Sequence, residues 1–120
     1  MKIAISSKGG SLESEVDARF GRCPYFIIVE IQKGEIKSSK ALKNTATAHQ
    51  RGAGPTAAEL VANQGVKTVI TQNIGPRAVS AMKKLGIKVY KSSGLIKEVV
   101  QEFISGELKE MTGTSSGCAK

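Results

Sequence analysis

The fold is decided by residues 25–38, which read YFIIVEIQKGEIKS. The first half of this stretch is aromatic or β-branched almost throughout and predicts a buried β-strand. The Lys33-Gly34 pair predicts a tight turn, and residues 35–38 predict a polar strand suited to the edge of a sheet. The sheet built around this hairpin must therefore include antiparallel strands.

A short buried strand over residues 2–6 precedes the hairpin, and alternating helices and strands follow it. Residues 7–21, with one helical turn, and residues 39–54 are expected to be polar connections, and a loop as long as the second is often functional. The elements expected after them are a helix from Pro55 to Gly65, a strand over 67–71, a helix over 76–85, a strand over 87–90 and a helix with the apolar face Leu95, Ile96, Val99, Val100 and Phe103.

This order of elements predicts an α/β fold, a three-layer α/β/α sandwich around a five-stranded mixed sheet. We expect the strand order 3-2-1-4-5, with strand 2 antiparallel to the others. The length of 120 residues fits a single domain over residues 1–110, followed by a flexible Gly/Ser-rich tail over 111–120.

Charge and cysteine content narrow the range of functions. Lys and Arg total 18 against 10 Asp and Glu, which gives a net charge of +8. Asp17 is the sole aspartate, which argues against paired-aspartate chemistry such as that of two-metal nucleases. Cys23 and Cys118 are too few for a disulfide framework, and neither a signal peptide nor a membrane-spanning run is visible. These features predict a cytoplasmic protein without a membrane partner.

The unusual polar residues gather at one place in the predicted topology. The carboxyl ends of strands 1, 3, 4 and 5 and the start of strand 2 share one edge of the sheet, and open α/β sheets bind ligands outside such an edge. The segments expected there are residues 6–8, 19–24, 49–55, 72–77 and 92–94.

Two helix starts at this edge favour an anionic ligand. Gly54-Pro55 and Gly75-Pro76 both place proline at the expected first helical position, and a helix start offers free N–H groups and a positive dipole end. Each alone is equally consistent with an ordinary helix start. Together they favour a polyanion because four arginines accompany them: Arg19, Arg22, Arg51 and Arg77.

Gly52-Ala53-Gly54 begins a formal match to the dinucleotide-binding pattern, but the context of that pattern is missing. The residues before Gly52 are polar rather than a hydrophobic strand. Arg77 stands about where the ribose-binding acid should fall. A P-loop sequence is absent as well, so a nucleotide site of either common type is not expected.

Two interpretations stay open for each candidate metal ligand. Cys23 lies between Arg22 and Pro24, so neighbouring arginines could lower its pKa and make it a thiolate ligand, or it could be a small buried residue at a strand start. His49, the sole histidine, could bind a ligand or transfer a proton, or could be a solvated loop residue.

Six short stretches carry a family resemblance, in order, from about residue 1 to residue 110. They are KIAI at 2–5, FGRCPYF at 20–26, GAG at 52–54, GVKTVI at 65–70, GPRA at 75–78 and GIKVY at 86–90. With them the chain resembles the dinitrogenase iron–molybdenum cofactor biosynthesis family, of the NifX type that also forms the C-terminal region of NifB proteins. The fold of that family is a ribonuclease H-like motif with the sheet order 3-2-1-4-5.

The resemblance implies a non-catalytic accessory protein that binds or carries an anionic iron–sulfur or iron–molybdenum cofactor-type cluster. It would exchange the cluster with donor and acceptor proteins, and a homodimer would supply more ligands. The expected metal ligands are Cys23 and His49. The expected cofactor-binding residues are Arg19, Arg22, Cys23, His49, Arg51, Gly52, Gly54, Asn73, Gly75 and Arg77.

Two other functions compete with cluster binding. Lysine runs over residues 33–43 and 83–97 could contact nucleic acid, although the chain has few aromatic residues for stacking on bases. A nuclease is suggested by fold analogy alone. We reject the nuclease because residues 2–7 and 67–73, where its carboxylates should lie, contain neither Asp nor Glu.

Overall fold

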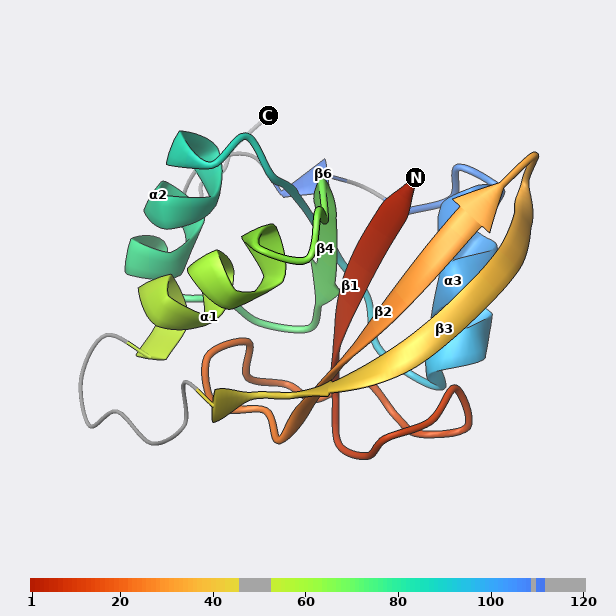
Figure 1. Ribbon diagram of the computed structural model, residues 1–120, viewed down its shortest axis with the longest axis horizontal. Coiled ribbons are helices and arrows are strands. Elements are labelled where there is room, and N and C mark those ends of the chain that lie inside the picture. Colours follow the sequence, from red (N-terminus) through yellow and green to blue (C-terminus); the bar gives the residue numbers. More distant parts are fainter. Residues whose placement is uncertain (46–52, 109, 112–120) are drawn as a thin grey trace.

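The computed structural model describes residues 1–45, 53–108 and 110–111, and it confirms the predicted order of elements (Figure 1). The strands are β1 (Lys2–Ser7), β2 (Tyr25–Gln32), β3 (Glu35–Lys43), β4 (Thr68–Thr71), β5 (Lys88–Lys91) and β6 (Glu110–Met111). The helices are α1 (Ala53–Ala62), α2 (Pro76–Lys84) and α3 (Ile96–Ile104).

The sheet has the order β3-β2-β1-β4-β5-β6. β2 is antiparallel to β1 and β3, whereas β1, β4 and β5 are parallel, so the predicted order and strand directions are confirmed. β1 lies at the centre because it is apolar enough to be covered on both faces, and its residues Ile3–Ser7 are all buried. The short strand β6 extends the sheet beyond the five strands that were predicted.

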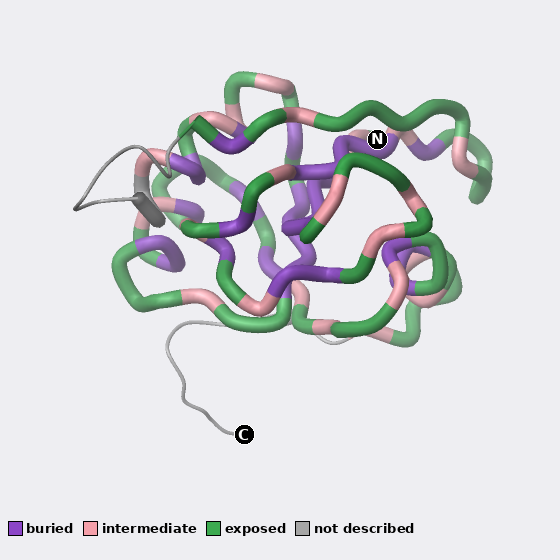
Figure 2. The backbone as a smooth tube through the Cα atoms, turned by 90° about the horizontal axis from the view of Figure 1, so that it is seen from below, coloured by how far each residue is buried: buried purple, intermediate pink, exposed green. Residues whose placement is uncertain are grey.

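Helices cover both faces of the sheet, which completes the predicted sandwich (Figure 1). α1 and α2 pack on one face, over a core that includes Phe26, Val61 and Met82. α3 packs on the other face, where Ile5, Ile27 and Val99 belong to a second core. Successive residues of β1 and β2 alternate between these cores, as the two-residue period of a strand requires. Figure 2 shows the buried centre and the largely exposed outer strand β3.

Two elements differ most from the expectation in extent. β3 runs from Glu35 to Lys43 instead of ending at residue 38, since pairing with β2 keeps a polar, exposed segment extended. α1 begins at Ala53, so Pro55 is its third residue. The missing N–H of Pro55 is tolerated there because the first four N–H groups of a helix have no acceptor inside the helix.

The connection between β1 and β2 contains no helical turn in the described structure, contrary to expectation. It is held instead by isolated bridges from Ser7 to Val16 and from Glu15 to Leu95. The N–H groups of Ile96 and Lys97, at the start of α3, donate to the carbonyl oxygens of Ser14 at 2.9 Å and of Leu12 at 3.1 Å. This connection therefore caps α3, a tertiary contact that leaves no periodic signal in the sequence.

The predicted flexible tail lies almost entirely outside the described residues. The structure does not describe residues 46–52, 109 and 112–120, so the predicted flexible tail is not tested. No described helix is long and apolar enough to cross a membrane.

Candidate functional site

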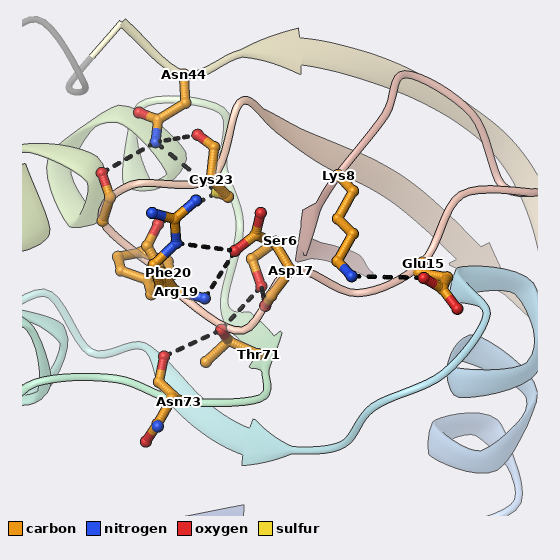
Figure 3. Close-up of polar contacts among 11 residues, drawn as sticks. Ser6, Lys8, Glu15, Asp17, Arg19, Phe20, Cys23, Asn44, Thr71 and Asn73 are labelled. Carbon is orange, nitrogen blue, oxygen red and sulfur yellow. Dashed lines mark hydrogen bonds and ion pairs between the residues drawn. The ribbon is translucent and has the colours of Figure 1, made fainter.

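The edge of the sheet where β1, β3, β4 and β5 end and β2 begins is called here the carboxyl edge. Segments far apart in the sequence meet there, as predicted (Figure 3). The backbone N–H of Phe20 donates to the carbonyl oxygen of Asn73 at 3.2 Å. Asn44, directly after β3, donates from Nδ2 to the carbonyl oxygens of Cys23 at 2.8 Å and of Gly21 at 3.2 Å. Residues 17–24 are therefore tied to the ends of both β3 and β4.

Buried hydroxyl groups join the ends of the two central parallel strands. The Ser6 hydroxyl donates to the carbonyl oxygen of Asp17 at 2.9 Å and lies 2.8 Å from the Thr71 hydroxyl oxygen. Ser6 and Thr71 are fully buried. Every buried side-chain nitrogen and oxygen in the described part of the chain has a hydrogen-bond partner. This network is complete without a ligand, so it shapes the edge rather than binding at it.

Asp17 forms the turn that begins residues 17–24. Its carboxylate oxygen Oδ1 accepts the backbone N–H of Arg19 at 2.8 Å and lies 3.6 Å from Nε of the same arginine. An aspartate that accepts the N–H two residues later forms an Asx turn. Asp17 is buried while the Arg19 side chain is 67% exposed, so the turn presents a cation to solvent.

Residues 17–24 alternate between anchors and exposed cations. Phe20 is buried against Phe26, with ring centroids 5.1 Å apart, and Cys23 is fully buried. Arg19 and Arg22 are exposed. The buried side chains of Phe20 and Cys23 hold this segment on the core. The arginine before each of them is therefore exposed at the carboxyl edge.

Cys23 is a protonated thiol in this arrangement. Burial raises its pKa to about 12, and the charge of Asp17 acts in the same direction, against smaller opposing contributions from the Ser7 backbone and the Asn44 side chain. The thiol donates to the carbonyl oxygen of Phe20 at 3.2 Å. Of the two interpretations, the one in which neighbouring arginines lower this pKa is wrong, because burial of the thiol is the dominant effect and raises it. The interpretation of Cys23 as a small buried residue is favoured.

The start of α2 matches its prediction. Gly75 is the N-cap in an extended conformation, Pro76 is the first helical residue, and no side chain caps the helix. Asn73, Gly75 and Arg77 are exposed around this start. Residues 92–94 follow β5 at the same edge, where the Ser92 N–H donates to the carbonyl oxygen of Thr71 at 3.2 Å. The Ser92 hydroxyl donates to Glu102 on α3 at 3.2 Å.

The structure thus brings some of the predicted residues together and leaves others untested. Gly54 is the second residue of α1. His49, Arg51 and Gly52 lie outside the described residues. The described residues contain no group of three or more His, Cys, Asp or Glu side chains that could hold a metal ion. The predicted residues placed at the carboxyl edge are Arg19, Arg22, Cys23, Asn73, Gly75 and Arg77.

Three residues that shape the site were not predicted. Asp17 had one signal, since an aspartate two residues before Arg19 is the spacing of an Asx turn. Thr71 and Asn44 had none, because the partners that bury them come from distant segments: Ser6 for Thr71, and residues 21–23 for Asn44.

Comparison with protein families gives a match over nearly all of the described chain. Residues 1–106 match the family described as dinitrogenase iron-molybdenum cofactor. An uncharacterized protein of Methanocaldococcus jannaschii, MJ0580, is 45% identical over 111 residues, which cover 92% of this chain and 91% of that protein.

Solved structures share the fold along almost the whole chain. The apo form of the orange protein from Desulfovibrio gigas is 30% identical with a TM-score of 0.88, and the match covers 96% of each chain. A Thermotoga protein with a provisional NifB name, TM1290, is 34% identical with a TM-score of 0.80, over 96% of this chain and 97% of that one.

Proposed function

The chain belongs to the dinitrogenase iron-molybdenum cofactor family, and we propose that it is a non-catalytic accessory protein that binds an anionic metallocluster of the iron–sulfur or iron–molybdenum cofactor type. The observation that carries this proposal is the exposure of Arg19, Arg22 and Arg77 at the carboxyl edge, beside the start of α2, which no side chain caps. Exposed guanidinium groups and helix N–H groups suit an anionic cargo because both donate hydrogen bonds to it.

The names of the relatives point in the same direction. The family is named for a metallocluster cofactor, and the orange protein structure is that of an apo form, the term for a protein without its bound group. This chain shares the fold of that protein and is 30% identical to it. These likenesses support a role related to a cofactor, and the arginines at the carboxyl edge suggest how an anionic cofactor is held.

The proposed contacts differ from a conventional cysteine-ligated site. A metal–sulfur bond needs a sulfur that the cluster can reach, and the Cys23 thiol is fully buried, which also raises its pKa. We therefore assign cargo contact to Arg19, Arg22, Asn73 and Arg77, and to backbone N–H groups after Gly54 and Gly75. His49, with Arg51 and Gly52 beside it, is the proposed direct ligand from the part of the chain that the structure does not describe.

The absence of catalysis is part of the same proposal. Asp17 is a buried residue at the carboxyl edge, and its carboxylate oxygen Oδ1 accepts the N–H of Arg19. This carboxylate therefore has a structural role. A two-metal nuclease needs several carboxylates around its ions. A carrier instead receives its cluster from a donor protein and delivers it to an acceptor, and we propose this role, in the cytoplasm.

Anaerobic reconstitution with iron and sulfide tests the proposal. We expect the wild-type chain to acquire visible absorption and bound iron, and His49→Ala to bind much less. Cys23→Ala should bind as much as wild type, provided that it is folded, because Cys23 does not ligate in this account. Negligible iron on the wild-type chain would refute the proposed function, and loss of iron in Cys23→Ala with His49→Ala unaffected would refute the assignment of contacts.

A further inference from the structure

The edge strand β3 is long and exposed. It has nine residues, and it ends the sheet on one side within the described residues. All of its residues are exposed except Ile36 and Leu42, which are half-buried. On an edge strand, every second residue directs its N–H and C=O away from the sheet, where another strand can pair with them. β3 therefore offers a template for strand addition.

The regular part of this template is residues 38–43. Register with β2 is continuous from Glu30↔Ser38 to Tyr25↔Lys43, then shifts so that Ile36 pairs with Ile31 and Lys37 is left over. Such an irregularity bends the strand and interrupts the ladder. A partner strand of about six residues matches the uninterrupted segment.

Lysines set the charge of the template. Lys40 pairs with Ile28 and so lies on the face of the sheet covered by α1 and α2, whereas Lys43 pairs with Tyr25 and lies on the other face. Lys37 stands at the irregularity. Two copies of this chain joined through β3 would bring these lysines together, and like charges on paired strands destabilise the pairing. The charge disfavours a second copy at β3 and favours an acidic partner.

A hollow lies beside the template. It has a volume of about 170 Å³ and is lined by Lys2, Ile28, Glu30, Ser38, Ser39 and Lys40. Two lysines and one glutamate line it, and no ion pair joins these lysines to Glu30 in the described structure. The Lys2 ammonium group donates to the carbonyl oxygen of Gln64 at 3.4 Å. A side chain from a strand added next to Ser38 and Lys40 would lie at the mouth of this hollow, since neighbouring strands are about 4.8 Å apart.

We propose that residues 38–43 of β3 are a docking site for an extended acidic segment of a partner protein. The segment pairs with β3 as a further strand of the sheet and directs an acidic side chain toward Lys2 and Lys40. Main-chain hydrogen bonds supply affinity in this mode of recognition, and the flanking pockets and charges supply specificity. The hollow lies beside Lys2, at the end of β1 away from the carboxyl edge, whereas the docking segment itself ends at Lys43, next to that edge.

A basic strand could also bind nucleic acid, which is a polyanion like the acidic protein segment. β3 contains no aromatic side chain on which bases could stack. Unpaired backbone groups along a strand match another strand better than they match a phosphate chain. A protein segment is therefore the occupant that both the backbone and the charge favour.

Titration with a designed peptide, followed by amide NMR of the full chain, tests this docking. The probe is a nine-residue peptide that alternates glutamate and valine. Its controls are the same peptide with proline at two central positions, a lysine–valine peptide, and an oligothymidine of equal length. We expect the glutamate–valine peptide to shift and protect amides of residues 38–43, and all three controls to bind at least about tenfold more weakly.

Charge reversal supplies the matched comparison. The double variant Lys40→Glu, Lys43→Glu should have an affinity for the glutamate–valine peptide that is at least about tenfold lower, and it should bind the lysine–valine peptide. Lys83→Glu with Lys84→Glu, on exposed positions at the end of α2, should leave both affinities unchanged. Equal binding of the proline peptide would overturn strand addition. Equal binding of the oligothymidine, or amide shifts away from β3, would overturn the site itself.

Discussion

The buried thiol of Cys23 couples the stability of the fold to alkaline pH. Its pKa is raised from 9.0 to about 12 in the folded chain. Below pH 9 both the folded and the unfolded chain keep the proton, and the thiol adds no pH dependence. Between pH 9 and 12 the unfolded chain loses the proton while the folded chain keeps it, so unfolding becomes more favourable as pH rises.

This coupling can be measured in a Cys118→Ala background, where Cys23 is the remaining cysteine. We expect the free energy of unfolding to fall above pH 9 by about 1.4 kcal/mol per pH unit more than in the same background with Cys23→Ala. Urea denaturation at a series of pH values gives both slopes. Parallel slopes for the two proteins would show that Cys23 is not a buried, protonated thiol.

The surroundings of buried polar residues could not be predicted from the sequence. Cys23 was correctly placed at a strand start, but its two interpretations stayed open, because the sequence does not show how deeply the thiol is buried. Asn44 fell within the polar connection expected over residues 39–54. Its contacts with Gly21 and Cys23 exist only because β3 returns the chain to residues 17–24.

Loop backbones decide how the elements are capped and joined. Gly94 has φ +110°, a conformation that L residues rarely adopt, and its carbonyl oxygen accepts the N–H of Val16 at 2.8 Å. This bond, with those from Ile96 and Lys97, ties the segment after β1 to the start of α3. Gly75 caps α2 with φ −78°, which any residue adopts.

The same substitution is therefore expected to have effects of different size at the two glycines. Gly94→Ala should lower the free energy of unfolding by about 1–3 kcal/mol, because alanine is strained at that φ. Gly75→Ala should change it by less than about 0.5 kcal/mol, since no atom lies within 4 Å of the added Cβ. Thermal or urea unfolding of both variants checks the pair, and equal effects would contradict this account of the loops.

Predictability differs among the elements for a physical reason. The apolar strands β1, β2 and β4 were identified because burial on both faces leaves a dense apolar signal. β5 was identified as well, although only Val89 of its four residues is fully buried. The C-terminal half of β3 and the whole of β6 were missed. β3 is exposed and carries no apolar signal, and each of these strands is held by pairing with its neighbour. The predicted strand order succeeded because few connections between such elements are allowed.

At the scale of the whole molecule, the net charge of +8 separates into regions with different roles. Exposed arginines of the described chain gather at the carboxyl edge, at positions 19, 22 and 77. Lysines line β3, and others lie at the end of α2 and the start of β5, away from the carboxyl edge. The central claim is that the arginine region, rather than total charge, binds an anionic cluster.

The same change of charge can be made in both regions. The test variant combines Arg19→Gln, Arg22→Gln and Arg77→Gln at the carboxyl edge. The control combines Lys83→Gln, Lys84→Gln and Lys88→Gln, which are exposed at the opposite end of α2 and β5. Because each variant loses three positive charges, a difference between them reports position and not net charge.

Anaerobic equilibrium dialysis of a synthetic thiolate-ligated [4Fe–4S] anion against the three proteins is the most direct measurement. Bound iron at equilibrium gives the affinity of each protein. We predict that the arginine variant binds about 100-fold more weakly than wild type, at about 1 kcal/mol for each charged contact, and that the lysine variant stays within about threefold. Equal losses in the two variants, or no binding by wild type, would contradict the claim that the carboxyl edge binds the cluster.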